Sequence, residues 1–227
     1  MNSRKVLWIV GVVVLVGALI AGANYYFVRQ MPDLDRPFTP AERYPESIRQ
    51  ESIQKVESAI AELRENPELV SRWLELAVYR KGADDYEGAE DIWLYMTYTW
   101  PAEPTAYGNL ADLYQSVLVE PRKAEKYWKK YIEVAPANYD IGAYRSLHDL
   151  YRTKLSNPDR AREILLQALK ENPETTDLII PLAVFERMQG NVDAARMYFT
   201  QAKEIADKLG NTSLSSILNE ELKALEQ

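Results

Sequence analysis

The sequence offers few side chains that could carry out chemistry. Its 227 residues include no cysteine and a single histidine, His148. The lack of cysteine excludes disulfides, thiolate nucleophiles and cysteine-ligated metal or iron–sulfur sites. His148 could act as a general base or a metal ligand, but no metal-ligand set or nucleophile stands in register with it. We therefore interpret His148 as a side chain packed between helices, and we expect no metal site and no cofactor.

Two pairs of adjacent acidic residues are the other candidates for catalysis. Asp84-Asp85 and Glu220-Glu221 could bind a cation or act as acid and base. Aspartate is favoured in turns, however, and Glu220-Glu221 falls on the polar face of an amphipathic stretch. Glycine-rich phosphate loops and the H-E-x-x-H and G-x-S-x-G motifs are absent from the sequence. We predict no catalytic residue and a protein that is not an enzyme. The remote alternative is an envelope enzyme that uses acidic groove residues.

The first thirty residues differ in composition from the rest of the chain. Val6 to Val28 is a run of 23 residues without a charged side chain, and Arg4 and Lys5 precede it. As a helix this run would be about 34 Å long, which is enough to cross a hydrocarbon core of about 30 Å. We therefore predict a transmembrane signal anchor over residues 6–28.

The orientation of this anchor follows from its flanking charges. Arg4 and Lys5 outweigh Arg29, so residues 1–5 are expected to stay in the cytoplasm. The predicted localisation is a single-pass membrane protein whose C-terminal domain lies outside the cytoplasm. The alternative is a signal peptide that is cleaved after the A-x-A site at residues 21–23. Either reading places the rest of the chain outside the cytoplasm.

Residues 29–45 form a proline-rich segment between the apolar run and the helical region. Its four prolines, at positions 32, 37, 40 and 45, remove backbone donors and disfavour helix at the preceding residues. We predict an extended tether, which at about 3 Å per residue could reach roughly 50 Å. From Glu46 onwards helix formers dominate and strand signals are nearly absent, so the predicted fold is all-α.

Four stretches of the helical region share one pattern of large and small residues. A first helix in each stretch carries four marked positions. They are Trp73, Leu76, Ala77 and Arg80; Tyr107, Leu110, Ala111 and Tyr114; Tyr144, Leu147, His148 and Tyr151; and Ile179, Leu182, Ala183 and Glu186. A second helix follows, with an alanine at position 89, 124, 161 or 195, so the periods are 35, 37 and 34 residues. Alanine at a helix crossing lets two backbones approach, while the large residues fill the groove with the next helix.

This pattern resembles the tetratricopeptide repeat, a helix–turn–helix unit of about 34 residues. The resemblance covers roughly residues 70–207 and implies an α-solenoid of stacked hairpins, because one hairpin cannot bury its apolar face alone. The predicted units span 70–103, 104–138, 139–175 and 176–209. A leading half-repeat helix over 46–69 precedes them and a capping helix over 210–227 closes them, which makes about ten helices.

Two local departures from the pattern are expected. The longer periods arise from extra residues between the helices of the second and third units, at Val117–Pro121 and Lys154–Pro158. Pro181 lies inside the first helix of the fourth unit, where it can neither donate a hydrogen bond nor fit the preceding turn. That helix should begin late, near Asp177 or Leu178, or kink at the proline.

The resemblance also implies a function and a site. In such arrays the first helix of each unit lines a concave groove that binds a peptide or protein. The residues predicted to line it here are Leu74, Val78, Lys81, Asn109, Asp112, Gln115, Arg145, Asp149, Arg152 and Arg187. We predict a membrane-anchored, non-catalytic scaffold that binds a protein or peptide partner through this groove. Nucleic acid is not expected as a partner, because the net charge is −7 and phosphate binding needs clustered cations.

A second hypothesis is self-assembly, in which the chain is a structural component of an envelope complex and forms a homo-oligomer. Most aromatic residues fall on the packing positions of the repeats. Tyr95, Tyr98 and Trp100 do not, because they lie on more than one face at the end of one helix. These three residues are a candidate contact patch.

Overall fold

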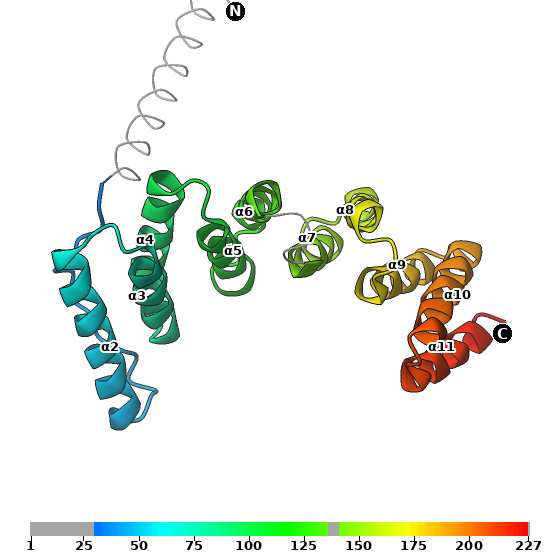
Figure 1. Ribbon diagram of the computed structural model, residues 1–227, viewed down its shortest axis with the longest axis horizontal. Helices are drawn as coiled ribbons and strands as arrows, with labels where there is room; N and C mark the ends of the chain where they lie inside the picture. Colours follow the sequence, from blue (N-terminus) through cyan, green and yellow to red (C-terminus); the bar gives the residue numbers. More distant parts are fainter. Residues whose placement is uncertain (1–29, 136–140, 227) are drawn as a thin grey trace, which may run out of the picture. The chain divides into compact units, whose positions relative to one another are not determined.

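The computed structural model describes residues 30–135 and 141–226, and within that part of the chain every regular element is helical. Ten α-helices and one short π-helix follow one another, which confirms the all-α prediction (Figure 1). No helix among these residues is long and apolar enough to cross a bilayer. The predicted anchor over 6–28 and the predicted cytoplasmic residues 1–5 lie outside the described residues. The chain divides into two compact units, Met1–Leu110 and Ala111–Gln227.

The first unit contains helices α2 (Glu46–Glu65), α3 (Val70–Gly82) and α4 (Tyr86–Thr99), and most of α5 (Pro104–Asp112). Helix α2 packs along α3, and α3 packs along α4. Trp73 and Trp93 are completely buried between these helices. The indole of Trp73 also donates a hydrogen bond to the carbonyl oxygen of Pro67 at 2.8 Å, which ties α3 to the turn after α2.

The second unit contains the remaining helices. Their bounds are η1 (Leu113–Val117), α6 (Pro121–Val134), α7 (Ile141–Thr153), α8 (Pro158–Glu171), α9 (Thr176–Met188), α10 (Val192–Lys208) and α11 (Thr212–Ala224). Helix α7 packs on both α6 and α8, and α10 packs on both α9 and α11 (Figure 1). A buried cluster joins α9, α10 and α11, and Leu218 of α11 is its most C-terminal member. Helix α11 therefore covers the last apolar face.

The four repeat alanines lie where the helices cross. Ala89, Ala124, Ala161 and Ala195 are all fully buried. A larger side chain at these positions would push the crossing helices apart, because protein interiors leave almost no space unfilled. This burial explains why the alanines recur with the period of the hairpins.

The turn inside each hairpin has the same backbone conformation in all four repeats. The residue two positions before the second helix has a positive φ: 68° at Asp84, 54° at Val119, 48° at Ser156 and 79° at Gly190. Only glycine adopts this left-handed conformation without a steric cost. Val119 is the least suited of the four, because a β-branched side chain at positive φ is strained.

Replacing Val119 with glycine is therefore expected to stabilise the protein. The side chain is 57% exposed, so its removal gives up little burial. Relief of the left-handed strain outweighs the extra freedom of glycine in the unfolded chain by about 0.5–1 kcal/mol. Thermal unfolding should show a rise in melting temperature of about 1–3 °C. The matched control is Val192→Gly, an exposed valine at the start of α10, where the melting temperature should fall. A fall for both variants would contradict the strain at Val119.

The two expected irregularities take specific forms in the structure. In the second hairpin the chain continues past α5 as a π-helix that ends at Val117, where Leu118 N donates to Leu113 O at 3.0 Å. Residues 118–120 then join it to α6, so only the two end residues of the predicted extra segment 117–121 are helical. In the third hairpin residues 154–157 join α7 to α8. Pro181 stands inside α9, which begins at Thr176, one residue before the predicted start. The late start places Pro181 only in the second turn, so few hydrogen bonds precede it.

Candidate functional site

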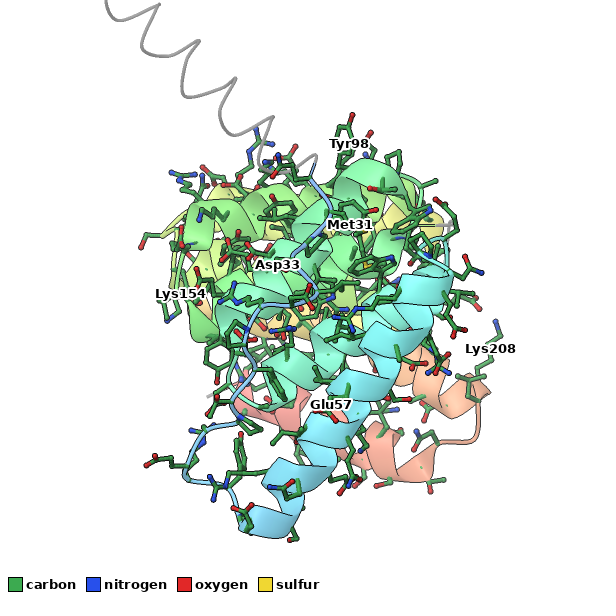
Figure 2. The ribbon with its side chains drawn as sticks, turned by 90° about the vertical axis from the view of Figure 1, so that its left-hand side faces the viewer. Met31, Asp33, Glu57, Tyr98, Lys154 and Lys208 are labelled. Carbon is green, nitrogen blue, oxygen red and sulfur yellow. The ribbon has the colours of Figure 1, made fainter. Side chains whose placement is uncertain are left out.

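The segment predicted to be a free tether is docked on the first hairpin. Residues 31–44, which we call the strap, run beside α2 (Figure 2). The amide of Ala41 donates to the carbonyl oxygen of Ala83 at 3.2 Å, and Arg43 pairs with Asp84 at 2.7 Å. Pro40 is buried. The strap is non-helical, as its prolines indicated. The predicted reach of roughly 50 Å from the membrane segment is wrong for it, because these contacts hold the strap along the hairpin.

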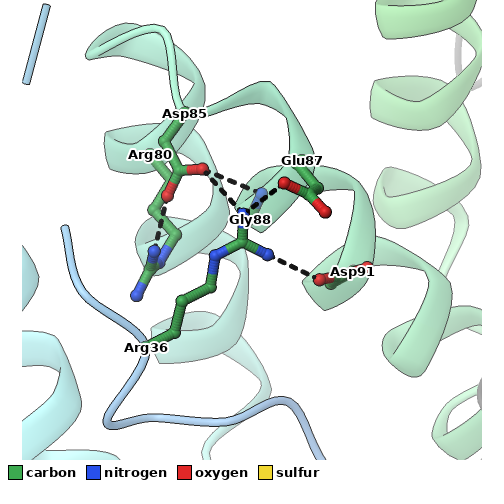
Figure 3. Close-up of polar contacts among 6 residues, drawn as sticks. All are labelled: Arg36, Arg80, Asp85, Glu87, Gly88 and Asp91. Atoms are coloured by element: carbon green, nitrogen blue, oxygen red, sulfur yellow. Dashed lines mark hydrogen bonds and ion pairs between the residues drawn. The ribbon is translucent and has the colours of Figure 1, made fainter. Parts of the chain in front are cut away.

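Arg36 of the strap is surrounded by carboxylates of the turn and of α4. Its guanidinium lies 2.7 Å from Glu87, 2.9 Å from Asp91 and 3.6 Å from Asp85 (Figure 3). Burial raises the pKa of Asp91, and the nearby negative charges of Glu87 and Asp85 raise it further, whereas Arg36 lowers it. This edge of the hairpin therefore carries excess negative charge, which the strap arginine offsets.

Asp85 connects the strap to a buried charge in α3. Its carboxylate accepts a hydrogen bond from Arg80 Nη1 at 2.5 Å and another from the Gly88 amide at 3.0 Å. Arg80 is only 2% exposed, and the ring of Phe38 in the strap lies 5.4 Å from its guanidinium. A Cβ at position 88 would lie 2.4 Å from Asp85 Oδ2, so any residue other than glycine would force the Asp85 carboxylate to move. A cavity of about 130 Å³ separates the strap from α3 and α4, with Leu34, Leu76 and Ile92 in its walls.

The groove residues predicted for the first unit lie mainly on α3. Leu74, Val78 and Lys81 follow one another at helical spacing, so they share one face. Val78 is 49% exposed, while Leu74 and Lys81 are half-buried. Asn109 is half-buried on α5. The face of α3 therefore combines apolar Leu74 and Val78 with the charged Lys81.

In the second unit the predicted residues fall into two groups. Three of them already contact neighbouring side chains of the fold. Asp112 accepts from Ser116 Oγ at 3.0 Å, Gln115 accepts from Trp128 Nε1 at 2.6 Å, and Arg187 donates to Glu221 of α11. These contacts give the three residues a structural role.

The other group lies on α7. Arg145, Asp149 and Arg152 are exposed and, at spacings of four and three residues, share one face of the helix. Arg152 and Asp149 form an ion pair at 3.2 Å, which at this exposure contributes little stability. The face of α7 is therefore a charged stripe that the packing of the unit does not use. Among residues 30–135 and 141–226 no group of three or more acidic or histidine side chains could hold a metal ion.

Comparison with solved structures identifies the architecture. MamA superposes with a TM-score of 0.58 at 17% identity, covering 74% of this chain and 99% of MamA. YrrB, described as a TPR protein with an unusual peptide-binding site, gives 0.52 at 16% identity over 75% of this chain and 93% of YrrB. PilW, a type IV pilus biogenesis factor, gives 0.51 at 18% identity over 77% of this chain and 86% of PilW. The chain has a tetratricopeptide-repeat fold. No protein-family model and no curated protein matches its sequence.

One position of the tetratricopeptide pattern carries polar links that the sequence did not suggest. It is the last marked position of the first helix, occupied by Arg80, Tyr114, Tyr151 and Glu186. In the second unit the Tyr151 hydroxyl donates to Glu125 of α6 at 2.8 Å. Glu186 accepts from Arg162 of α8 at 2.5 and 2.7 Å. The sequence feature that could have indicated these links is the presence of a charged residue, Arg80 or Glu186, at a packing position that is tyrosine in the other two repeats.

His148 occupies the small-residue position of the third tetratricopeptide unit. It is 4% exposed, and its ring lies edge-on to Phe185 with centroids 5.3 Å apart. Its Nδ1 is 2.9 Å from the carbonyl oxygen of Ala161, which can only accept, so Nδ1 carries the proton. The packed role predicted from the sequence agrees with this geometry. Burial lowers the pKa of His148, although the hydrogen bond to Ala161 and the charge of Asp149 oppose that change.

This burial makes stability depend on pH. Because the folded pKa lies below the ordinary value of about 6.5, the unfolded chain binds the proton more readily. Stability should be full above that value and should decline as pH falls through it. Thermal melts between pH 7.5 and 5.5 should show this decline. His148→Gln keeps a donor for Ala161 and removes the only histidine, so its melting temperature should stay flat over that range. An equal decline in both proteins would show that another group is responsible.

Proposed function

We propose that this chain is a non-catalytic scaffold that binds a protein or peptide partner through the exposed faces of its first repeat helices. The observation that carries the proposal is the charged stripe on α7. Arg145, Asp149 and Arg152 are presented to solvent, while the neighbouring faces of α7 pack against α6 and α8. Charges on a preformed surface set the register and association rate of a partner. The repeat fold supports this use, because YrrB, which shares it, is described as having a peptide-binding site.

We also propose that the scaffold is anchored in a membrane. The support comes from the sequence, in which the uncharged run Val6 to Val28 follows Arg4 and Lys5. In this arrangement the N-terminus is cytoplasmic and the repeats lie outside the cytoplasm. Mass spectrometry of the membrane-extracted protein tests it, because an N-terminus at Asn24 would mean a cleaved signal peptide.

The binding proposal is tested by crosslinking from intact membranes, followed by quantitative recovery of the captured partner with purified variants. Arg145→Ala/Arg152→Ala removes two positive charges from α7. Arg160→Ala/Lys170→Ala removes two from exposed positions of α8 and serves as the matched control. We expect the α7 variant to lose about tenfold in recovery, as is typical for losing charges at an interface, and the control to lose little. Equal recovery with wild type and the α7 variant would exclude this face as the binding site.

A further inference from the structure

The strap and α4 run in opposite directions. Ala41 lies at the turn before α4, where it bonds to Ala83, and Arg36 lies beside Asp91, one turn and a half into the helix. Pro32 and Leu34 face Ile92 across the small cavity. Met31 therefore lies toward the C-terminal half of α4. Figure 2 shows Met31 and Tyr98 at the same end of the first unit, with Glu57 of α2 well below them.

This end of the unit exposes apolar and aromatic side chains. Met31 is 52% exposed and Tyr98 is 37% exposed. Trp100, which ends α4, is half-buried and packs edge-on against Tyr95 at 5.8 Å. Tyrosine and tryptophan favour the interface between water and lipid, because one end of each side chain is polar and the other apolar.

The length of chain before the strap decides what covers this end. Only Arg29 and Gln30 separate Met31 from Val28, the last residue of the proposed membrane segment. Three steps from Val28 to Met31 span at most about 11 Å. We propose that the strap holds the first repeat hairpin against the bilayer, with Met31, Tyr98 and Trp100 as its contact with the lipid interface. This inference rests on the membrane anchoring proposed above.

Arg36 is the residue that keeps the hairpin close to the membrane. It is the strap side chain that bonds to carboxylates on both the turn and the body of α4. Without it the strap residues before Phe38 lose their ion pairs to α4, while Phe38, Ala41 and Arg43 still hold the rest of the strap to α3 and the turn. The position of the hairpin relative to the lipid therefore depends on the ion cluster that Arg36 forms with Asp85, Glu87 and Asp91.

The absence of cysteine allows a direct test in the full-length protein. Tyr98→Cys, labelled with a nitrobenzoxadiazole fluorophore, is reconstituted into phosphatidylcholine vesicles that contain a doxyl-labelled lipid as quencher. Ser47→Cys, an exposed position at the opposite end of the strap, is the matched control. We expect blue-shifted emission and about threefold stronger lipid quenching at position 98, because an interfacial site brings the label closer to the quencher than a site away from the lipid. Equal quenching at the two positions would overturn the inference.

A second pair of variants tests the role of the strap. In the Tyr98→Cys background, Arg36→Ala should reduce lipid quenching to the level seen at position 47. Arg160→Ala, which removes an exposed arginine of α8, should leave it unchanged. Circular dichroism establishes that each variant is folded. Full quenching in folded Arg36→Ala would overturn the role of the ion cluster.

Three further outcomes have different meanings. Protein that is retained in carbonate-washed vesicles but shows no quenching at position 98 refutes the lipid contact and leaves the anchor in place. Protein that the wash removes refutes the anchor and the contact together. A label that is shielded from water, is not quenched by lipid and depends on protein concentration would assign the patch to a second copy of the chain, against the inference.

Discussion

Arginine in place of Ala195 is expected to unfold the second unit. Ala195 is completely buried in the cluster that joins α9, α10 and α11, together with Ile179 and Phe199. An arginine side chain there would overfill a close-packed crossing and bury a charge without a partner. We expect a cost of at least about 4 kcal/mol, a large fraction of the 5–15 kcal/mol that holds a typical domain together. Circular dichroism should show a fall in melting temperature of about 10 °C or more, or loss of the cooperative transition.

The same substitution at an exposed alanine is the control, because it introduces arginine into a helix without crowding a helix crossing. Ala224 is exposed near the end of α11, so Ala224→Arg should melt within about 1 °C of wild type. Ala161→Arg, at the crossing of the third hairpin, should behave like Ala195→Arg. If Ala195→Arg has the same melting temperature as wild type, the alanines do not mark tight crossings and the stacked-hairpin explanation of their spacing fails.

The hairpins could be predicted from the sequence because their constraint is local and repeated. Each crossing alanine stands 16 or 17 residues after the first large residue of its own hairpin, and this near-constant spacing occurs four times. A pattern repeated in this way indicates helix positions and their buried faces together. The left-handed turns were harder to predict. Only the fourth has a glycine, Gly190, at the residue with positive φ, whereas the others have Asp84, Val119 and Ser156 there.

The docking of the strap could not be predicted in the same way. Its prolines exclude helix but carry no information about what the segment contacts. The decisive ion pair joins Arg36 to Asp91, 55 residues away, and neither residue belongs to the repeat pattern. The partners of the predicted groove residues could not be predicted for a similar reason. Helical spacing places Arg187 on one face of its helix, but only the position of α11 shows that Arg187 pairs with Glu221.

A second large loss of stability is expected when the buried carboxylate of Glu186 loses its partner Arg162. Glu186 is 4% exposed and accepts two hydrogen bonds from Arg162 and one from Asn191 at 2.7 Å. Burial alone would raise the pKa of Glu186, but these hydrogen bonds and the charge of Arg162 lower it below its ordinary value. The carboxylate is therefore charged and stabilised by its partners. Because the folded pKa is depressed, this stabilisation is present above the ordinary pKa and is lost as pH falls through the folded one.

Removing the arginine should leave that charge buried with too few partners. Arg162→Met keeps the apolar stem, and we expect it to cost about 2–3 kcal/mol, less than a fully buried pair because the arginine is about one-third exposed. Urea unfolding at pH 7 measures the loss. Arg160→Met, which removes an exposed ion pair with Glu163 two residues earlier in α8, should cost less than about 0.5 kcal/mol. In a Glu186→Gln background, where no charge is left behind, Arg162→Met should cost less than half as much. An equal cost in both backgrounds would show that the arginine acts through packing, and that the charged pair does not hold α8 to α9.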